Sequence, residues 1–205
     1  MKLFLTSLGC DKNLVDSEEM TGLLSERGIG FTDEESEADV IIVNSCAFIG
    51  DAKEESIQTI LSLSENRIET GNGGKCRALI VCGCLAERYR EEVLKELPEV
   101  DAVVGTMAYR EIAETIDRVL SGERGFIVGE PCKEANKPLP SGKRILSTGG
   151  HYAYLKIAEG CDKRCTYCII PFLRGPYRSF PLEELLQEAE RLAGLGVKEL
   201  ILIAQ

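Results

Sequence analysis

The sequence predicts an α/β protein in which an open parallel sheet is followed by the first strand-helix-strand unit of a truncated (β/α) barrel. Along residues 1–125, short apolar runs alternate with longer amphipathic stretches. This pattern is typical of parallel strands whose connecting helices cover both faces of the sheet. Residues 126–150 contain several prolines and glycines, which predicts a linker, and the alternation resumes over residues 151–205. We therefore expect two units, and a chain of 205 residues with 44% apolar content is long enough to bury a sizeable core.

The first unit is expected to contain four strands, each followed by a helix. Asp16 and Glu19 have the spacing of a capping box, so the first helix is predicted to be capped by Asp16 and to end at Gly28. The predicted strands are residues 2–8, 39–44, 78–81 and 102–104, and the later helices are residues 52–66, 87–97 and 109–120.

Cysteines follow the first three predicted strands directly. Cys10 and Cys46 come after the first two, and Cys82 and Cys84 both lie at the end of the third. Because the carboxyl ends of parallel strands meet at one edge of a sheet, where ligands bind, these thiols are expected to gather as a metal site requires. The alternative is three half-buried cysteines without a shared role, since free cysteine is often a small core residue. On a continuing strand Cys82 and Cys84 would point to one face, so spacing alone does not decide which is the ligand. The remaining cysteines, for which a packing role is favoured, are Cys76, Cys82 and Cys132.

The second unit is predicted to be one repeat of a strand-helix barrel. A strand at residues 153–157 is followed by a cysteine-rich loop, by a helix that begins near Pro181, and by a strand at residues 200–203. A further short strand is expected at residues 126–128, within the linker. About 55 residues cannot form a closed barrel, which needs on the order of 200, so we expect an amino-terminal piece of a longer enzyme with exposed apolar edges.

The loop of the second unit contains three thiols with the spacing CxxxCxxC, at Cys161, Cys165 and Cys168. Three thiolates can bind three irons of a cubic iron-sulfur cluster, which normally has four cysteine ligands, and one iron is then open to a small molecule. The alternatives are a zinc site that lacks a ligand or thiols without a metal. Structural zinc sites are usually closed by four ligands, which disfavours the first. With Tyr167 before its last cysteine, the motif resembles the signature of radical S-adenosylmethionine enzymes.

Composition limits the partners and the compartment. A net charge of −10 disfavours nonspecific binding to a phosphate backbone and suits a basic protein partner better. The amino terminus is too short an apolar run for a secretory signal, and no stretch approaches the roughly 20 apolar residues that span a bilayer. Nine cysteines are explained better by metal ligation in a reducing compartment than by disulfides. We expect a cytoplasmic protein without membrane contact.

With both cysteine sets located, the chain resembles the methylthiotransferase family of radical S-adenosylmethionine enzymes. The resemblance covers nearly the whole chain and implies that Cys84, not Cys82, is the third ligand of the first site. The motifs of the first unit are residues 7–18, 43–49 and 83–85, and those of the second are residues 154–161 and 170–175.

Within that family the chain is similar to the RimO branch, which modifies the twelfth protein of the small ribosomal subunit. The branch that acts on transfer RNA usually has Gln-Met-Asn after its first cysteine and Ser-Val-Arg after its second, and neither is present here. Two departures from the family pattern are Ser45, where threonine is usual, and Phe180, where arginine is common. The branch that acts on transfer RNA is kept as the alternative, because it belongs to the same family.

The resemblance implies two [4Fe-4S] clusters, S-adenosylmethionine as a cofactor, and an electron donor protein as a partner. Cleavage of S-adenosylmethionine at the second cluster would generate a radical that takes hydrogen from the β carbon of an aspartate, and the first cluster would deliver the sulfur. Tyr167 would lie against the adenine, with loop packing as its alternative role. Arg174 and Arg178 would meet carboxylates of cofactor or substrate, or would be solvated charges. A different class, a cluster-binding module without catalysis, predicts clusters but no cleavage of S-adenosylmethionine.

Overall fold

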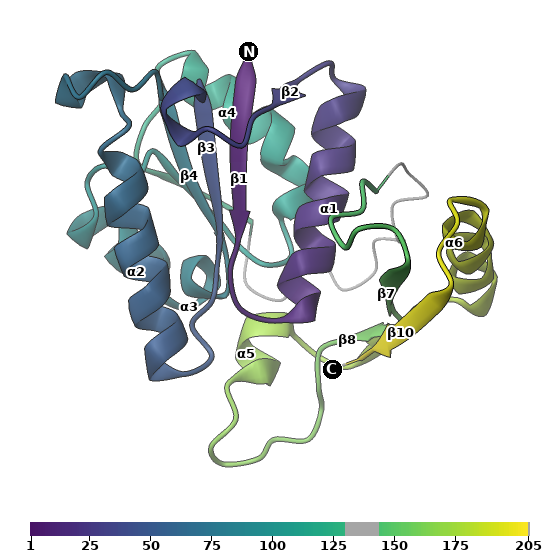
Figure 1. Ribbon diagram of the computed structural model, residues 1–205. Coiled ribbons are helices and arrows are strands. Elements are labelled where there is room, and N and C mark those ends of the chain that lie inside the picture. The colour runs from purple at the N-terminus through teal and green to yellow at the C-terminus, as the bar shows by residue number, and fades with distance from the viewer. Residues whose placement is uncertain (130–143, 205) are drawn as a thin grey trace.

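The computed structural model describes residues 1–129 and 144–204, so that the predicted linker prolines and Cys132 lie outside the described residues. Its largest element is a six-stranded parallel sheet of order β2-β1-β3-β4-β5-β6 (Figure 1). The fold class predicted from the alternation of strands and helices is confirmed. The strands of this sheet are β1 (Lys2–Ser7), β2 (Gly30–Phe31), β3 (Val40–Ser45), β4 (Ala78–Gly83), β5 (Ala102–Val104) and β6 (Phe126–Val128).

Helices cover both faces of this sheet, as Figure 1 shows. On one face α1 and α4 pack with Met20 and Ile116, and on the other α2 and α3 pack with Ile60 and Leu85. Every residue of β3 is buried, because neighbouring side chains point to opposite faces and both faces are covered. These helices are α1 (Asp11–Glu26), α2 (Gly50–Ser64), α3 (Cys84–Glu96) and α4 (Ile112–Leu120).

The second unit has the predicted strand-helix-strand order. Its two long strands pair in parallel, and α6 packs on them through the fully buried Leu192. A short antiparallel pair and a five-residue helix were not predicted; both belong to the segment that contains the cysteine loop. No closed barrel forms in the described residues. The elements are β7 (Tyr152–Lys156), β8 (Ala158–Glu159), α5 (Ile170–Arg174), β9 (Arg178–Ser179), α6 (Leu182–Gly194) and β10 (Glu199–Ile203).

Two details differ from the expectations. The first helix is capped by Cys10 and begins at Asp11, so the predicted cap at Asp16 is wrong: this carboxylate lies in the second turn and is 4% exposed. Residues Phe126–Val128 form the predicted strand, but it pairs with β5 as the last strand of the first sheet, whereas we expected it within the linker. The limits of the two domains stay a prediction. No helix in the described part of the chain combines the length and the apolarity that crossing a bilayer demands.

Candidate metal centres

The first cysteine trio lies where the first, third and fourth strands end. Cys10 is the cap residue of α1, Cys46 follows β3, and Cys84 is the first residue of α3. Cys46 packs against Gly9, since a Cβ built on Gly9 would lie 2.7 Å from the Cys46 sulfur. Cys84 lies within electrostatic range of both other thiols. The three cysteines are therefore neighbours at one edge of the sheet, and Cys10 is the exposed member.

Gly83 separates Cys84 from Cys82. Its φ of 86° and ψ of −156° turn the chain from β4 into α3, so the strand does not continue to Cys84. Cys82 points into the core beneath α1 and α4, and Cys84 lies on the face covered by α2 and α3. Burial raises the pKa of the Cys82 thiol. The two thiols therefore lie on opposite faces of the sheet, and only Cys84 is a neighbour of Cys10 and Cys46.

Asn13 fixes the loops of this trio to one another. Its amide donates to the carbonyl oxygens of Leu8 (2.8 Å) and Ser45 (3.0 Å), which precede Cys10 and Cys46 respectively. The Cys46 backbone is held in turn by the hydroxyl of Ser56, at 2.9 Å from the amide nitrogen and 2.8 Å from the carbonyl oxygen. Hydrogen bonds thus hold two of the three cysteine loops to helices α1 and α2.

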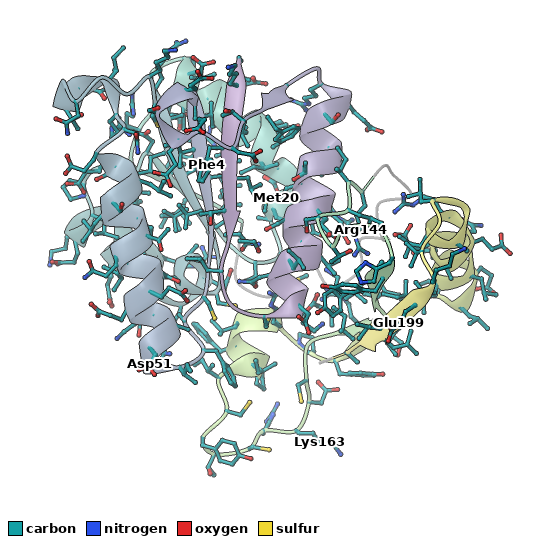
Figure 2. The ribbon with its side chains drawn as sticks, viewed as in Figure 1. Phe4, Met20, Asp51, Arg144, Lys163 and Glu199 are labelled. Atoms are coloured by element: carbon teal, nitrogen blue, oxygen red, sulfur yellow. The ribbon has the colours of Figure 1, made fainter. Side chains whose placement is uncertain are left out.

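The second trio lies on the loop between β8 and α5, which projects from the lower end of the molecule in Figure 1. Cys168 donates its amide to the carbonyl of Cys165 at 3.0 Å, which closes a tight turn between these two residues. The amide of Cys161 bonds the carbonyl of Gly175 at 3.0 Å and closes the base of the loop. Figure 2 shows Lys163 near the far end of this loop, among sulfur atoms.

Tyr167 projects from the same loop and is 91% exposed, so it does not pack against the described residues. Its predicted contact with a cofactor stays a prediction. Arg178 is partly buried, and its Nη2 lies 3.5 Å from the sulfur of Met107. Its buried Nε has no hydrogen-bond partner among the described residues, and both roles expected for Arg178 stay predictions.

A buried charge network joins α1 to the second unit. Asp16 pairs with Lys156 at 2.5 Å and with Arg174 at 2.7 Å, and all three side chains are at most 5% exposed. Burial alone would raise the pKa of Asp16, but the two cations lower it to about 2. Glu159 adds a second carboxylate, 3.2 Å from the ammonium of Lys12. The cations and carboxylates compensate one another, as buried charges must.

A neighbouring contact ties the segment before β7 to the same helix. Glu18 accepts hydrogen bonds from the guanidinium of Arg144 and from the amide and hydroxyl of Ser147, each at 2.7 Å. Arg144 also donates to the carbonyl of Tyr154 at 2.7 Å. Figure 2 shows Arg144 between α1 and β7. The second unit is thus held on α1 by several buried charge pairs and hydrogen bonds.

The donor sets suit iron-sulfur clusters better than a single ion. Across residues 1–129 and 144–204, no three His, Cys, Asp or Glu side chains converge closely enough to hold one metal ion. A cubic cluster does not require this, because each thiolate binds a different iron. Cys10 is the N-cap residue of α1 and Cys84 is the first residue of α3. Burial raises the pKa of the Cys84 thiol to about 11, against the opposing effect of the nearby Arg174. Both trios consist of thiols alone, which fits iron and sulfide.

The sequence patterns did not reveal the residues that connect the two trios. Asn13, Lys156 and Glu159 lie inside the quoted motifs, but their long-range partners cannot be derived from spacing. A lysine near the end of an apolar strand was one available signal, because a buried lysine requires a partner of opposite charge. Arg174 was expected to meet a cofactor, a substrate or solvent, and it instead meets the carboxylate of Asp16.

Two family models match separate parts of the chain. Residues 2–105, just over half of the chain, match the family model described as "Uncharacterized protein family UPF0004". The chain belongs to family UPF0004. A second part of the chain, residues 155–205, matches the model of the radical SAM superfamily.

Several relatives of this UPF0004 chain have the name "Ribosomal protein uS12 methylthiotransferase RimO". The protein from Lachnoclostridium phytofermentans is 58% identical over 207 residues, and the one from Pelotomaculum thermopropionicum is 52% identical over 205. Each alignment covers 100% of this chain but 45% of the relative, so the chain spans less than half the length of these proteins. The predicted resemblance to the methylthiotransferases, and to their RimO branch, is confirmed.

Solved structures support the fold of this UPF0004 member. The radical S-adenosylmethionine methyltransferase TsrM from Kitasatospora setae, determined with tryptophan and an S-adenosylmethionine analogue, superposes with a TM-score of 0.61. The match covers 100% of this chain and 47% of TsrM at 12% identity. At that identity the similarity concerns the fold alone.

Proposed function

We propose that this chain is the two-cluster portion of a radical S-adenosylmethionine methylthiotransferase that modifies an aspartate of a small-subunit ribosomal protein. The observation that supports it best is the arrangement of six cysteines in two trios, one at a sheet edge and one on the loop that leads into α5. The relatives named RimO supply the substrate class, since they align over the whole chain.

The residues divide the work between the two centres. Cys161, Cys165 and Cys168 would hold one [4Fe-4S] cluster and leave an iron for S-adenosylmethionine, with the exposed Tyr167 beside the adenine. Cys10, Cys46 and Cys84 would hold the other cluster, which is the sulfur-donating one. When bound, the clusters and S-adenosylmethionine supply one-electron chemistry at an unactivated carbon, which no side-chain acid or base can perform. An electron donor protein is therefore expected as a partner, and a ribosomal substrate is consistent with a cytoplasmic enzyme.

Iron and sulfide analysis of the 205-residue chain after anaerobic reconstitution tests the two sites. About eight irons per chain are expected, because each cubic cluster contains four. Replacing the three cysteines of either trio with alanine should leave about four. Cys76→Ala, a change of a fully buried thiol outside both trios, is the matched control and should leave about eight. About four irons in the unmodified chain would mean that one trio is not a cluster site.

The full-length enzyme tests the reaction and the substrate. Incubated with S-adenosylmethionine and reductant, it should release 5′-deoxyadenosine, whereas a cluster-binding module without catalysis should not. A small-subunit ribosomal protein should gain the mass of a methylthio group. Transfer RNA gaining that mass instead would favour the alternative branch of the family.

A further inference from the structure

Arg174 connects the two cysteine trios. It is the last residue of α5, six positions after Cys168, yet its side chain extends toward the other trio. Its Nη2 lies 4.0 Å from the sulfur of Cys84 and 2.6 Å from the Oδ1 of Asn13. The helix that follows one cysteine loop therefore places a guanidinium against a thiol of the other site.

The guanidinium of Arg174 is fixed on several sides. Its Nη1 donates to Asp16 at 2.7 Å and lies 3.6 Å from Glu159, while its Nη2 faces Cys84 and Asn13. The residue is 2% exposed. The planar fork of arginine can satisfy these acceptors at once, and lysine, with one charged nitrogen, cannot. The orientation of the guanidinium toward the sulfur is thus imposed by the carboxylates behind it.

A cationic donor beside a cluster sulfur changes the electron affinity of the cluster. Reduction adds negative charge, which a nearby positive charge and a hydrogen bond to sulfur stabilise, so both raise the reduction potential. We infer that Arg174 is a positioning residue of the Cys10/Cys46/Cys84 site, which acts through the Cys84 sulfur to raise the reduction potential of the cluster bound there. This inference rests on the proposed function, because it requires a cluster on that trio.

Lys156 provides the comparison within the same network. It is buried to a similar degree, 3% exposed, and pairs with the same Asp16 carboxylate, but it has no contact with a cysteine among the described residues. Removing Lys156 or Arg174 deletes one buried cation in each case. Only the change at Arg174 removes a donor from the Cys84 sulfur, so an effect of the contact separates from an effect of the lost charge.

The test uses the full-length protein with Cys161, Cys165 and Cys168 replaced by alanine, so that one cluster remains. After anaerobic reconstitution, its reduction by dithionite is followed by electron paramagnetic resonance at controlled potentials. Arg174→Gln is expected to shift the midpoint potential to a more negative value and to change the g values. Arg174→Lys should shift it less, and Lys156→Met should shift it least.

Arg174→Gln leaves Asp16 short of a cation, so Arg174→Gln with Asp16→Asn is measured as well; this pair loses one charge of each sign. Iron content and circular dichroism identify the variants that are folded and loaded. A midpoint potential that is unchanged in both Arg174 variants, or moved equally by Lys156→Met, would overturn the inference and leave the proposed function intact. Failure of the parent protein to bind a cluster at Cys10, Cys46 and Cys84 would overturn both.

Discussion

At the scale of single residues, the cysteines differ in access and in acidity. Cys10 and Cys165 are exposed, whereas Cys76 and Cys82 are at most 1% exposed. Burial raises the pKa of the Cys76 thiol to about 11. Because the thiolate is the nucleophile, reactivity should follow this division.

We therefore expect iodoacetamide at pH 8 to label the metal-free, folded chain at Cys10 and Cys165 first. A pKa of about 11 alone lowers the thiolate fraction of Cys76 roughly 100-fold below that of an ordinary thiol. Peptide mass spectrometry after short pulses measures each rate, and labelling in denaturant provides the control in which all cysteines react. Labelling of Cys76 as fast as Cys10 in the folded chain would contradict the prediction.

Asp16 should make the stability of the chain depend on acid pH. The pKa of Asp16 is lowered to about 2 by Lys156 and Arg174 against the opposing effect of burial. A carboxylate whose pKa is lower in the folded state stabilises it above the unfolded pKa of about 4, and the stabilisation disappears as the pH falls through about 2. The loss amounts to about 2 kcal/mol, measured as the free energy of unfolding in urea at a series of pH values.

Asp16→Asn should flatten that dependence between pH 4 and pH 2. It should also lower stability at pH 7 by about 3–5 kcal/mol, since two buried cations lose a partner. Asp117→Asn is the matched control, because Asp117 pairs with Arg27 at the surface, and it should change stability by less than ~1 kcal/mol. An unaltered acid profile in Asp16→Asn would show that other carboxylates determine it.

At the scale of elements, the junction of β4 and α3 depends on one glycine. A side chain at Gly83 would meet the Asn44 Oδ1 at 2.4 Å and the Ser45 carbonyl at 2.5 Å, and φ there is 86°. This backbone region is open essentially to glycine alone and costs other residues roughly 1–3 kcal/mol. The geometry that presents Cys84 to the first trio therefore requires glycine at this position.

Gly83→Ala should lower the midpoint of urea unfolding, with a loss of at least ~2 kcal/mol from strain and collision together. Gly122→Ala is the control: φ there is 104°, but no atom lies within 4 Å of the added carbon, so it should cost only about 1 kcal/mol. Equal effects of the two substitutions would mean that the loops around Gly83 adjust freely.

Regular elements were predictable, because their signal is local. The apolar runs located β1, β3, β4 and β5, and residues 126–128 were expected as a strand. The predictions that were wrong or missing concern residues whose partners are distant in sequence. The spacing of Asp16 and Glu19 resembles a cap, but Asp16 is buried by Lys156 and Arg174, more than a hundred residues away in sequence. The pairing of β6 with β5 and the contact of Arg174 with Cys84 likewise arise only in the folded chain.

The placement of the cysteines was partly predictable, because it follows from a general rule of parallel sheets. The rule that ligands gather at the carboxyl ends of parallel strands brought Cys10, Cys46 and the third strand together. It did not distinguish Cys82 from Cys84, because the backbone conformation of Gly83, and not the spacing, determines which of the two thiols faces the trio. Asn13, which holds two of the loops, gives no pattern of its own.

At the scale of the whole molecule, the second unit leaves an apolar surface exposed. On α6, Leu182 is 65% and Leu186 is 54% exposed, and on β10, Leu202 is 62% exposed. Exposed apolar patches and unpaired strands favour association. The 205-residue chain should therefore show an average mass in sedimentation velocity that rises with concentration.

Leu186→Glu should reduce this association without lowering the unfolding midpoint appreciably, because the side chain already faces solvent. Leu61→Glu on α2 is the control, since Leu61 is a partly exposed leucine away from the second unit, and it should leave the association unchanged. A monomer at every concentration in the unmodified chain would contradict the prediction.

The acidic residues along α1 have a consequence for any attempt to recombine such proteins. Asp16 and Glu18 obtain their cations from Lys156, Arg174 and Arg144, all contributed by sequence beyond the first sheet. Excised alone, the sheet-bearing half would display unneutralised carboxylates, and grafted onto a foreign barrel it would need a host with cations in matching places. The two halves therefore form a complementary set, and chimaeras should be more stable when both sides of this contact come from the same parent.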